Sequence, residues 1–543
     1  MSTIQIVPEA PRLSGHPEWI ERSLNVKAGR DPLGLQTITL DRIMPILLPG
    51  ILVLSQRARY FSLFPFLLRL YEELRLPPTN EALSDFVKLR EFEYAVAVQL
   101  CPRGCGQVSA GAVGKDRAGP AAATLSDAIE RQESVESFLG GYGLYYRTPL
   151  VELGLVVPRG TAVGEEVTPV DVLSRDERAQ ALADGFRDAV ADTAYHRDHM
   201  LGFEPIPRSV LEEFAERACL CRLPEYPEEQ RALRRALFEP PATQLEPQFD
   251  QRRRSFALFL RELERQPAVA GSNAAFRAAV WDDFTGRDGA DDDPLGTTLA
   301  QWAALAMKEH LQESLSAIWS HFCRLGLNAQ RQDGLTAAEL DELIRGPLLG
   351  QGPFDILGRS LSYDSAMPAR EFMSAVVEIT RPAAPEELRL WAIGEETGIA
   401  GLVLLLATIA RLPDRGSAPR AWAETGLQHS ERQPSLLGFA MLIEQQLEHE
   451  PSLADLFAWL VRRFVVSAHE QIAYSKLPDF TFRFRWESGR LRFYPIGLGR
   501  FDLADMRRQS MARLSEDVGL WAESDGVPLL TEAGSRFRGE VLE

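Results

Sequence analysis

The chain has 543 residues, of which 45% are hydrophobic and 25% are charged, a balance typical of a folded soluble protein with a large buried core. Its formal net charge of −18 argues against nucleic-acid binding over the whole surface but leaves room for a local basic face. Arginine supplies 54 of the 59 basic residues, so an arginine cluster indicates phosphate binding less strongly here than it would in a lysine-rich chain.

Three further features of the sequence bear on the compartment. Five cysteines in a chain of this length do not make a disulfide scaffold. Residues 1–23 contain neither a basic n-region nor an apolar h-region, so we expect no export signal and a cytoplasmic, bacterial protein. The most hydrophobic long segment, residues 43–75, is broken by two arginines into runs shorter than the ~20 residues of a membrane span. We therefore predict no membrane association.

The second half of that segment predicts a buried helix. From Ser55 onward the apolar residues cover nearly every face of a helix, which favours burial in a large core. Pro65 predicts a kink or break near residues 63–64. The functional question lies with Arg57 and Arg59. We expect them either to pair with buried acids, Glu91 or Glu93 being the candidates, or to open onto a cleft.

The rest of the chain predicts a mainly α, multi-helical fold, with a winged-helix-like C-terminal region and an Arg/aromatic β-hairpin. Residues 175–400 read as helix after helix, the longest at about 298–325, and a further helix is expected at 126–138. The expected domains are an N-terminal arm (1–36), a helical domain (37–195) with a possible winged-helix-like part (125–195), a helical middle domain (196–395), a helical bundle (396–478), and a hairpin with a winged-helix-like domain (479–543).

Two distant segments, residues 149–169 and 513–534, share one pattern. Each has an apolar helix end, a glycine stop, a short turn-rich hairpin and a threonine opening another helix. The glycine is a natural residue after a helix C-terminus, and Thr168 and Thr531 are natural N-caps. The pattern resembles the end of a winged-helix domain, more closely in the later copy.

The clearest strand signal is the period-two alternation of residues 480–486, repeated after a Glu-Ser-Gly turn in residues 490–494. It places arginines on one face and aromatic residues on the other. Residues 461–513 carry eleven basic residues against five acidic ones, so a phosphate-binding surface is one interpretation. Salt bridges to the acidic remainder are the alternative. The candidate nucleic-acid-binding residues are Arg483, Arg485, Arg490, Arg492, Arg507 and Arg508.

No constellation in the sequence predicts a catalytic site, a cofactor or a metal ion. His196 and His199 lie one helical turn apart and are weak zinc candidates that lack a third ligand. Four cysteines form two close pairs, Cys101 with Cys105 and Cys219 with Cys221. Neither pair has CxxC spacing, and Cys219 and Cys221 fall within an expected amphipathic helix over 210–223, where cysteine packs as a small hydrophobe. The favoured interpretation is therefore packing rather than zinc.

Several blocks together resemble an uncharacterised bacterial family of large helical accessory proteins. They are the LPG…RARYFSLFPFLL signature of residues 48–68, the REFE segment at 90–93 leading to Gly111 and Gly114, the ACLC segment at 218–221, and the late KLPDFTFRF…LTEAG region. Members are often encoded beside DNA-directed or phage-defence machinery. The resemblance implies no activity, catalytic residue or cofactor.

Three functional hypotheses follow. The leading one is a non-enzymatic accessory protein, in the setting of an antiviral defence system, that associates with DNA through its C-terminal hairpin and winged helix. The second is a protein–protein scaffold for an ATPase or nuclease encoded nearby. The third is a metal-dependent hydrolase that uses His196 and His199.

Overall fold

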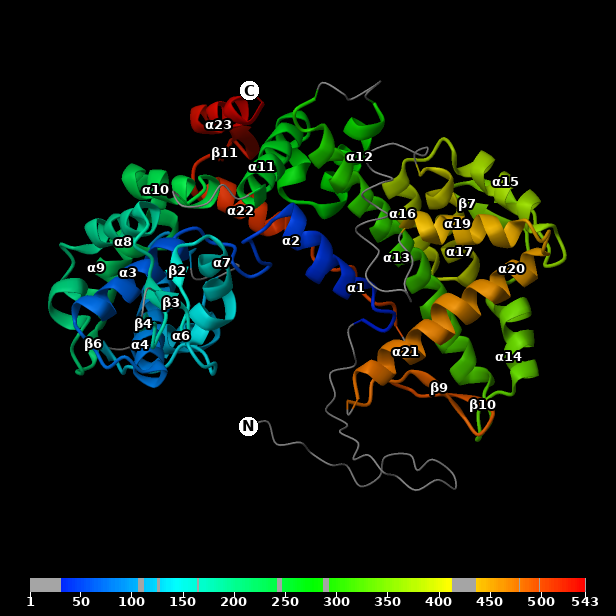
Figure 1. Ribbon diagram of the computed structural model, residues 1–543, viewed down its shortest axis with the longest axis horizontal. Coiled ribbons are helices and arrows are strands. Elements are labelled where there is room, and N and C mark those ends of the chain that lie inside the picture. Colours follow the sequence, from blue (N-terminus) through cyan, green and yellow to red (C-terminus); the bar gives the residue numbers. More distant parts are fainter. Residues whose placement is uncertain are drawn as a thin grey trace. The chain divides into compact units, whose positions relative to one another are not determined.

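The computed structural model is mainly helical, with short two-stranded sheets between the helices (Figure 1). It describes residues 31–105, 112–124, 127–163, 166–241, 247–286, 293–412, 436–477, 479–497 and 499–542, so most of the expected N-terminal arm lies outside the described residues. Among the helices of these ranges, none combines the length and the apolar character that crossing a membrane requires.

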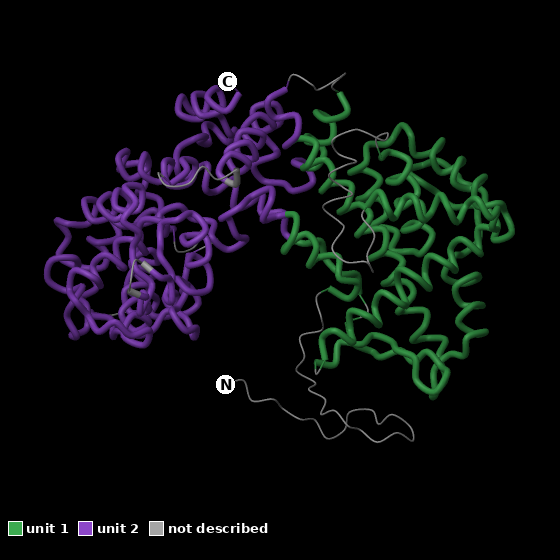
Figure 2. The backbone as a smooth tube through the Cα atoms, viewed as in Figure 1, with its two compact units in different colours: residues 1–43, 277–291, 299–504 green, residues 44–276, 292–298, 505–543 purple. Residues whose placement is uncertain are grey.

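The chain forms two compact units, each drawn from several stretches of sequence (Figure 2). Unit 1 comprises residues 1–43, 277–291 and 299–504. Unit 2 comprises residues 44–276, 292–298 and 505–543. The expected domain ranges are distributed over these two units, because unit 2 takes in both the early helices and the last 39 residues of the chain.

Unit 2 is a helical body with small antiparallel sheets. Its helices are α2 (Met44–Leu47), α3 (Tyr60–Glu73), α4 (Asn80–Gln99), α6 (Lys115–Thr124), η2 (Tyr142–Tyr146), α7 (Arg147–Glu152), α8 (Glu177–Val190), η3 (Tyr195–His199), α9 (Arg208–Ala218), η4 (Leu220–Glu225), α10 (Pro227–Phe238), α11 (Pro247–Arg265), η5 (Pro267–Ala270), α22 (Arg508–Asp517) and α23 (Glu532–Leu542). Its strand pairs are β1–β6 (Ala128–Ile129 with Ile206–Pro207), β2–β5 (Val156–Val157 with Val172–Leu173), β3–β4 (Ala162–Val163 with Glu166–Val167) and β11–β12 (Trp521–Ser524 with Val527–Leu530).

Helix α3 is the buried centre of unit 2, as the apolar pattern of residues 43–75 predicts. It packs against α8, and the Tyr60 ring lies 5.0–5.7 Å from the rings of Phe64, Tyr94 and Tyr146. The helix begins at Tyr60 rather than at Ser55. The expected break at Pro65 is also wrong, because the helix runs through that residue.

The expected helix at 126–138 is wrong. Residues 128–129 instead form strand β1 and pair with β6, and residues 130–138 contain no helix. Tertiary contacts account for this, because Arg131 donates hydrogen bonds to the Glu204 carbonyl oxygen (3.0 Å) and to the Glu93 carboxylate. The contact of Arg131 with the buried Glu93 and the pairing of β1 with β6 thus override the local helix propensity of this segment.

The two segments that look alike in sequence share a helix-stop geometry. Gly154 and Gly519 both have positive φ, +70° and +75°. After each, the next amide donates to a carbonyl five residues back, Leu155 to Leu150 and Leu520 to Ser515, which is the hydrogen bond of a Schellman stop.

The threonines after the two stops differ. Thr531 precedes α23, and its hydroxyl accepts a hydrogen bond from the Gly534 amide at 3.0 Å, as an N-cap should. Thr168 does not cap a helix. Its hydroxyl donates to the Pro158 carbonyl at 2.9 Å, and α8 begins only at Glu177, capped by Asp176. The expectation for Thr168 is therefore wrong, because strand β5 follows it instead of a helix.

Unit 1 is built around α13 (Gly296–Ala329), a 34-residue helix whose residues from Leu299 onward belong to this unit. Its other helices are α1 (Leu35–Ile38), η1 (Thr39–Ile43), the later part of α12 (Asn273–Thr285), α14 (Ala337–Leu343), η7 (Ile344–Leu348), α15 (Ala369–Thr380), α16 (Pro385–Glu395), α17 (Gly398–Ala410), α19 (Leu436–Leu447), α20 (Leu453–Leu460), η8 (Val461–Ser467) and α21 (Ala468–Ser475). Its strands are β7 (Phe354–Ile356), β8 (Arg359–Leu361), β9 (Phe484–Glu487) and β10 (Arg490–Phe493).

Strands β9 and β10 pair antiparallel, with Arg492 opposite Arg485 and Phe493 opposite Phe484. The two turn residues, Ser488 and Gly489, both have positive φ (50° and 79°), the backbone that a tight hairpin turn requires. The aromatic face packs on α13, where the ring of Phe322 lies 5.2 Å from the rings of both Phe484 and Phe493.

A buried network of charges surrounds the middle of α13. Glu386 of α16 accepts hydrogen bonds from Arg277 at 3.1 Å and Arg389 at 2.7 Å, and His310 lies 3.2 Å away. Arg277 also pairs with Glu309 at 2.9 Å. All of these side chains are nearly inaccessible to solvent, so each charge depends on its partners for stabilisation.

Candidate metal centre

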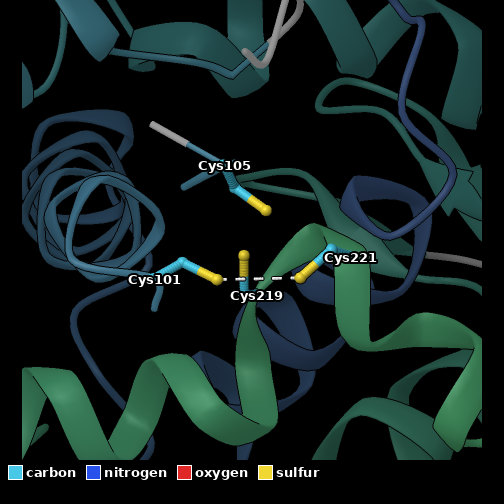
Figure 3. Close-up of side chains that lie close together, drawn as sticks. All are labelled: Cys101, Cys105, Cys219 and Cys221. Carbon is cyan, nitrogen blue, oxygen red and sulfur yellow. Dashed lines mark hydrogen bonds between the residues drawn. The ribbon is translucent and has the colours of Figure 1, made fainter. Parts of the chain in front are cut away.

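Four cysteines converge in unit 2 from two chain segments (Figure 3). Cys101 follows the end of α4, and the turn to Cys105 is closed by a 2.9 Å hydrogen bond from the Gly104 amide to the Cys101 carbonyl. Cys219 follows the end of α9, and Cys221 lies in η4. Because α4 packs against α9, the two helix ends bring both pairs to one place.

The four sulfurs lie close enough together to share one tetrahedral metal ion. All lie within 4.8 Å of one another, and the sulfurs of Cys101 and Cys221 are 3.7 Å apart. Four sulfurs each about 2.3 Å from zinc in a tetrahedron are separated by roughly 3.8 Å. A disulfide requires about 2.05 Å, and all four cysteines are free thiols. The set therefore fits a Cys₄ zinc ion, or another thiophilic ion of the same geometry.

The thiols differ in how readily they ionise. Hydrogen bonding from the Cys219 thiol, with further bonds from Cys105 and Cys101 and the charge of Arg103, lowers the pKa of Cys221 to about 5. Burial raises the pKa of Cys105 to about 12. Metal ions bind the thiolate form of cysteine, so the lowered pKa of Cys221 favours binding.

A buried arginine supports the backbone of this centre. Arg59 donates to the Cys219 carbonyl at 2.6 Å and pairs with Glu229 at 3.0 Å, and both charged side chains are fully inaccessible. On the outer side, Arg103 and Arg222 share the Glu225 carboxylate at 2.6 and 2.9 Å. Arginines near the sulfurs favour the net negative charge of a metal ion bound by four thiolates.

One premise of the packing interpretation, a helix that runs through Cys219 and Cys221, is contradicted by the structure. Helix α9 ends at Ala218 rather than near residue 223, and Cys219 has an extended backbone (φ −58°, ψ 147°). The sequence signal that was available is that both pairs come directly after a helix end.

Arg57 and Arg59 both lie in ion pairs, but with other acids than Glu91 and Glu93. Arg57 pairs with Asp517 of α22 through two hydrogen bonds of 2.9 and 3.0 Å, and the partner of Arg59 is Glu229 of α10. The two arginines therefore join α3 to elements far along the chain.

Glu91 and Glu93 have partners of their own. Glu91 accepts hydrogen bonds from the amides of Gly141 and Tyr142 at 2.9 Å each, and burial raises its pKa to about 7. Glu93 is bound by Arg131 and Tyr195. Neither carboxylate therefore forms the expected ion pair with Arg57 or Arg59.

Replacing Arg59 with methionine is expected to lower the free energy of unfolding by about 3–5 kcal/mol, because it leaves Glu229 charged and buried without a partner. The double variant Arg59→Met with Glu229→Gln should recover much of that loss, since no buried charge remains. Urea denaturation followed by fluorescence measures both. Equal losses in the single and double variants would contradict the pairing.

Among the described residues, none joins His196 and His199 as a third metal ligand. Within the described ranges, the four cysteines form the one group of three or more side chains positioned to share a metal ion. The His196 ring packs on Phe66 with centroids 5.9 Å apart, and burial lowers its pKa. A metal-dependent hydrolase at these histidines has no geometric support in the described part of the chain.

Three of the six arginines named for nucleic-acid binding are buried. Arg483 donates to the carbonyls of Thr481 and Gly497 at 3.0 and 3.2 Å. It lies one residue before β9, so the alternation that would place it on the outer face does not reach it. Arg507 and Arg508 are each 6% exposed. Burial contradicts the expectation that these three lie on an accessible face.

The buried positions of Arg507 and Arg508 follow from their partners at the start of α22. Arg507 donates to the Ile51 carbonyl at 2.5 Å, and Arg508 donates to the Asn273 side chain at 2.7 Å. Both therefore tie α22 to the rest of unit 2.

The other three arginines line the open face of the hairpin but have acidic neighbours. Arg485 pairs with Glu487 at 2.7 Å, Arg492 lies 3.7 Å from the same carboxylate, and Arg490 lies 3.7 Å from Glu339. Their side chains are 19–39% exposed. The salt-bridge alternative raised by the sequence thus describes their contacts within the chain.

Comparisons with protein-family models, with curated proteins and with solved structures found no match to this chain.

Proposed function

We propose that this protein is a zinc-binding, non-enzymatic accessory protein, in which a Cys₄ centre fastens the end of α4 to the α9–η4 segment. The observation that carries the proposal is the convergence of four free thiols within 4.8 Å. Four protein ligands fill the tetrahedral coordination of zinc and leave no position for water or substrate, which is the arrangement of structural rather than catalytic zinc.

Metal analysis of the purified full chain tests the proposal. One zinc ion per chain is expected for the wild type, and substantially less for Cys101→Ser and Cys221→Ser. Cys323→Ala is the matched control, because Cys323 is a buried free thiol outside the cluster. A wild type without stoichiometric metal, or cluster variants that retain it, would overturn the proposal.

The wider role that we propose is assembly with a partner encoded nearby, such as an ATPase or nuclease of a bacterial anti-phage system. Its support is the resemblance of the sequence blocks together with a metal centre suited to holding a fold together. Co-purification from cells that express the flanking genes tests it. Recovery of the chain alone, with the partner candidates present and folded, would count against it.

DNA association through the C-terminal region is the second candidate. The elements α22, β11, β12 and α23 follow in helix–hairpin–helix order, as at the end of a winged-helix domain, and Arg490 is partly exposed on the β9–β10 hairpin.

Charge reversal at Arg485, Arg490 and Arg492 is expected to abolish salt-sensitive binding to duplex DNA in a mobility-shift assay. Arg370→Glu, an exposed position on α15 of the same unit, is the control and should leave binding intact. A wild type that shifts no duplex at low salt would eliminate this candidate.

A further inference from the structure

A pocket of about 390 Å³ lies in unit 2 between α10, α11 and α23, and no cysteine lines it. Five arginines line it: Arg231, Arg234, Arg235, Arg253 and Arg536. Only two carboxylates do so, Glu239 and Glu540. Within a protein whose net charge is −18, this concentration of positive charge in a concave site is unusual.

The positive charge of the pocket is only partly neutralised from within the chain. Arg231 and Arg536 pair with Glu228 and Glu532 at 2.5 and 2.7 Å, acids outside the pocket lining. These pairs join residues three or four apart on one helix and are highly exposed, so each holds its arginine weakly. These two arginines can turn toward a ligand because breaking an exposed ion pair costs little free energy.

Two further arginines, Arg234 and Arg253, line the pocket without an acidic partner among the described residues. Arg234 donates to the Val518 carbonyl at 2.6 Å, which holds it in place without neutralising it. Burial lowers its pKa, and the charges of Arg231 and Arg536 lower it further. Arg253 has no ion pair with any residue that the structure describes. Like charges held together in this way favour an anion that relieves their repulsion.

Two aromatic side chains give the pocket an apolar part. Phe238 of α10 and Phe537 of α23 are both buried, and their ring centroids are 4.6 Å apart. A volume near 400 Å³ is in the range of ligand sites, and planar guanidinium groups match phosphate oxygens in pairs.

We propose that this arginine pocket binds a multiply phosphorylated anion, supplied either by a free nucleotide or by the phosphates of a nucleic-acid strand. The site rests on residues distinct from the cysteine centre and from the β9–β10 hairpin. A negative result for the arginine pocket would therefore not affect the metal proposal or the hairpin candidate. Negative results for those two would likewise not affect the pocket proposal.

Calorimetric titration of the full chain at low salt with three probes tests the proposal: sodium tripolyphosphate, adenosine triphosphate without magnesium, and a short 5′-phosphorylated single-stranded DNA. Tripolyphosphate is expected to bind. The double variant Arg253→Ala with Arg536→Ala should weaken binding by at least about ten-fold, since it removes charge-assisted hydrogen bonds. Arg253 has no ion pair within the described residues, and the Arg536–Glu532 pair is largely exposed, so unfolding midpoints should match the wild type.

Arg175→Ala is the matched control, because that side chain is 87% exposed, pairs with Glu72 and lies outside the pocket lining. It should bind as the wild type does. Tighter binding of the nucleotide than of the DNA assigns the site to a free nucleotide, and the reverse order assigns it to a strand. No tripolyphosphate binding, equal binding by the double variant, or equal loss in Arg175→Ala would overturn the proposal.

Discussion

Replacing Cys219 with serine is expected to release the metal ion. The free energy of local opening of the segments around residues 99–105 and 218–225 should then fall by several kcal/mol. The cause is loss of a cross-link between two chain segments, and the apparent binding energy of structural zinc in small peptides, about 10–16 kcal/mol, sets its upper limit. Native-state hydrogen exchange measures the effect locally, which suits a chain of two units that need not unfold together.

Wild-type protein treated with a strong chelator is compared with Cys219→Ser. Its amide hydrogens in the two segments should exchange as fast as those of the variant. Cys323→Ala should leave exchange in these segments unchanged, because Cys323 lies in unit 1 on α13. Protection of residues 99–105 that survives both Cys219→Ser and chelation would mean that packing alone holds the segments together.

Replacing Glu386 with glutamine is expected to destabilise unit 1 by about 3–5 kcal/mol, because it leaves Arg277 and Arg389 buried with one charged partner fewer. Glu396→Gln is the control. That carboxylate is about half exposed and pairs with Arg324 at 3.3 Å, so its loss should cost at most about 1 kcal/mol. Urea denaturation followed by tryptophan fluorescence compares the two variants with the wild type.

The Glu386 effect should depend on pH. Burial alone would raise the pKa of Glu386, but hydrogen bonds from His310, Arg389 and Arg277 outweigh it and hold the pKa well below the ordinary value of 4.5. The stability from its charged form is therefore complete above pH 4.5 and is lost as the pH falls toward the lowered value. The gap between wild type and Glu386→Gln should narrow in acid. A gap that widens below pH 4.5 would contradict the network.

Local signals in the sequence were sufficient for several elements of the fold. Alternating aromatics predicted the strand pair around Ser488–Gly489, and unbroken apolar coverage predicted that α3 is buried. Gly154 and Gly519 were recognisable as helix stops because positive φ is required there. Each of these depends on residues close together in the chain.

Features that depend on distant residues were not predictable in the same way. Arg57 and Asp517 are 460 residues apart, and Cys101 and Cys221 are 120 apart. Nothing in local spacing indicates which acid a buried arginine meets, so the nearby Glu91 and Glu93 were the natural but wrong choices. The cysteine cluster is not predictable for a related reason: the packing of α4 on α9 brings the two pairs together, and no sequence motif encodes that packing.

Side-chain exposure was also hard to predict from the sequence. An alternating pattern assigns side chains to the two faces only within a strand, and Arg483 lies just before β9. The arginine pocket draws on α10, α11 and α23, which are separated by hundreds of residues at their extremes. Its arginines are ordinary in sequence, spread through a chain in which 54 residues are arginine.

X-ray absorption at the zinc edge, on the purified full chain, tests the metal centre most directly. We expect one zinc per chain, bound by four sulfur neighbours at about 2.3 Å and by no nitrogen or oxygen atom. A spectrum with nitrogen or oxygen neighbours, or a preparation without stoichiometric metal, would contradict the claim that Cys101, Cys105, Cys219 and Cys221 together hold a structural zinc ion.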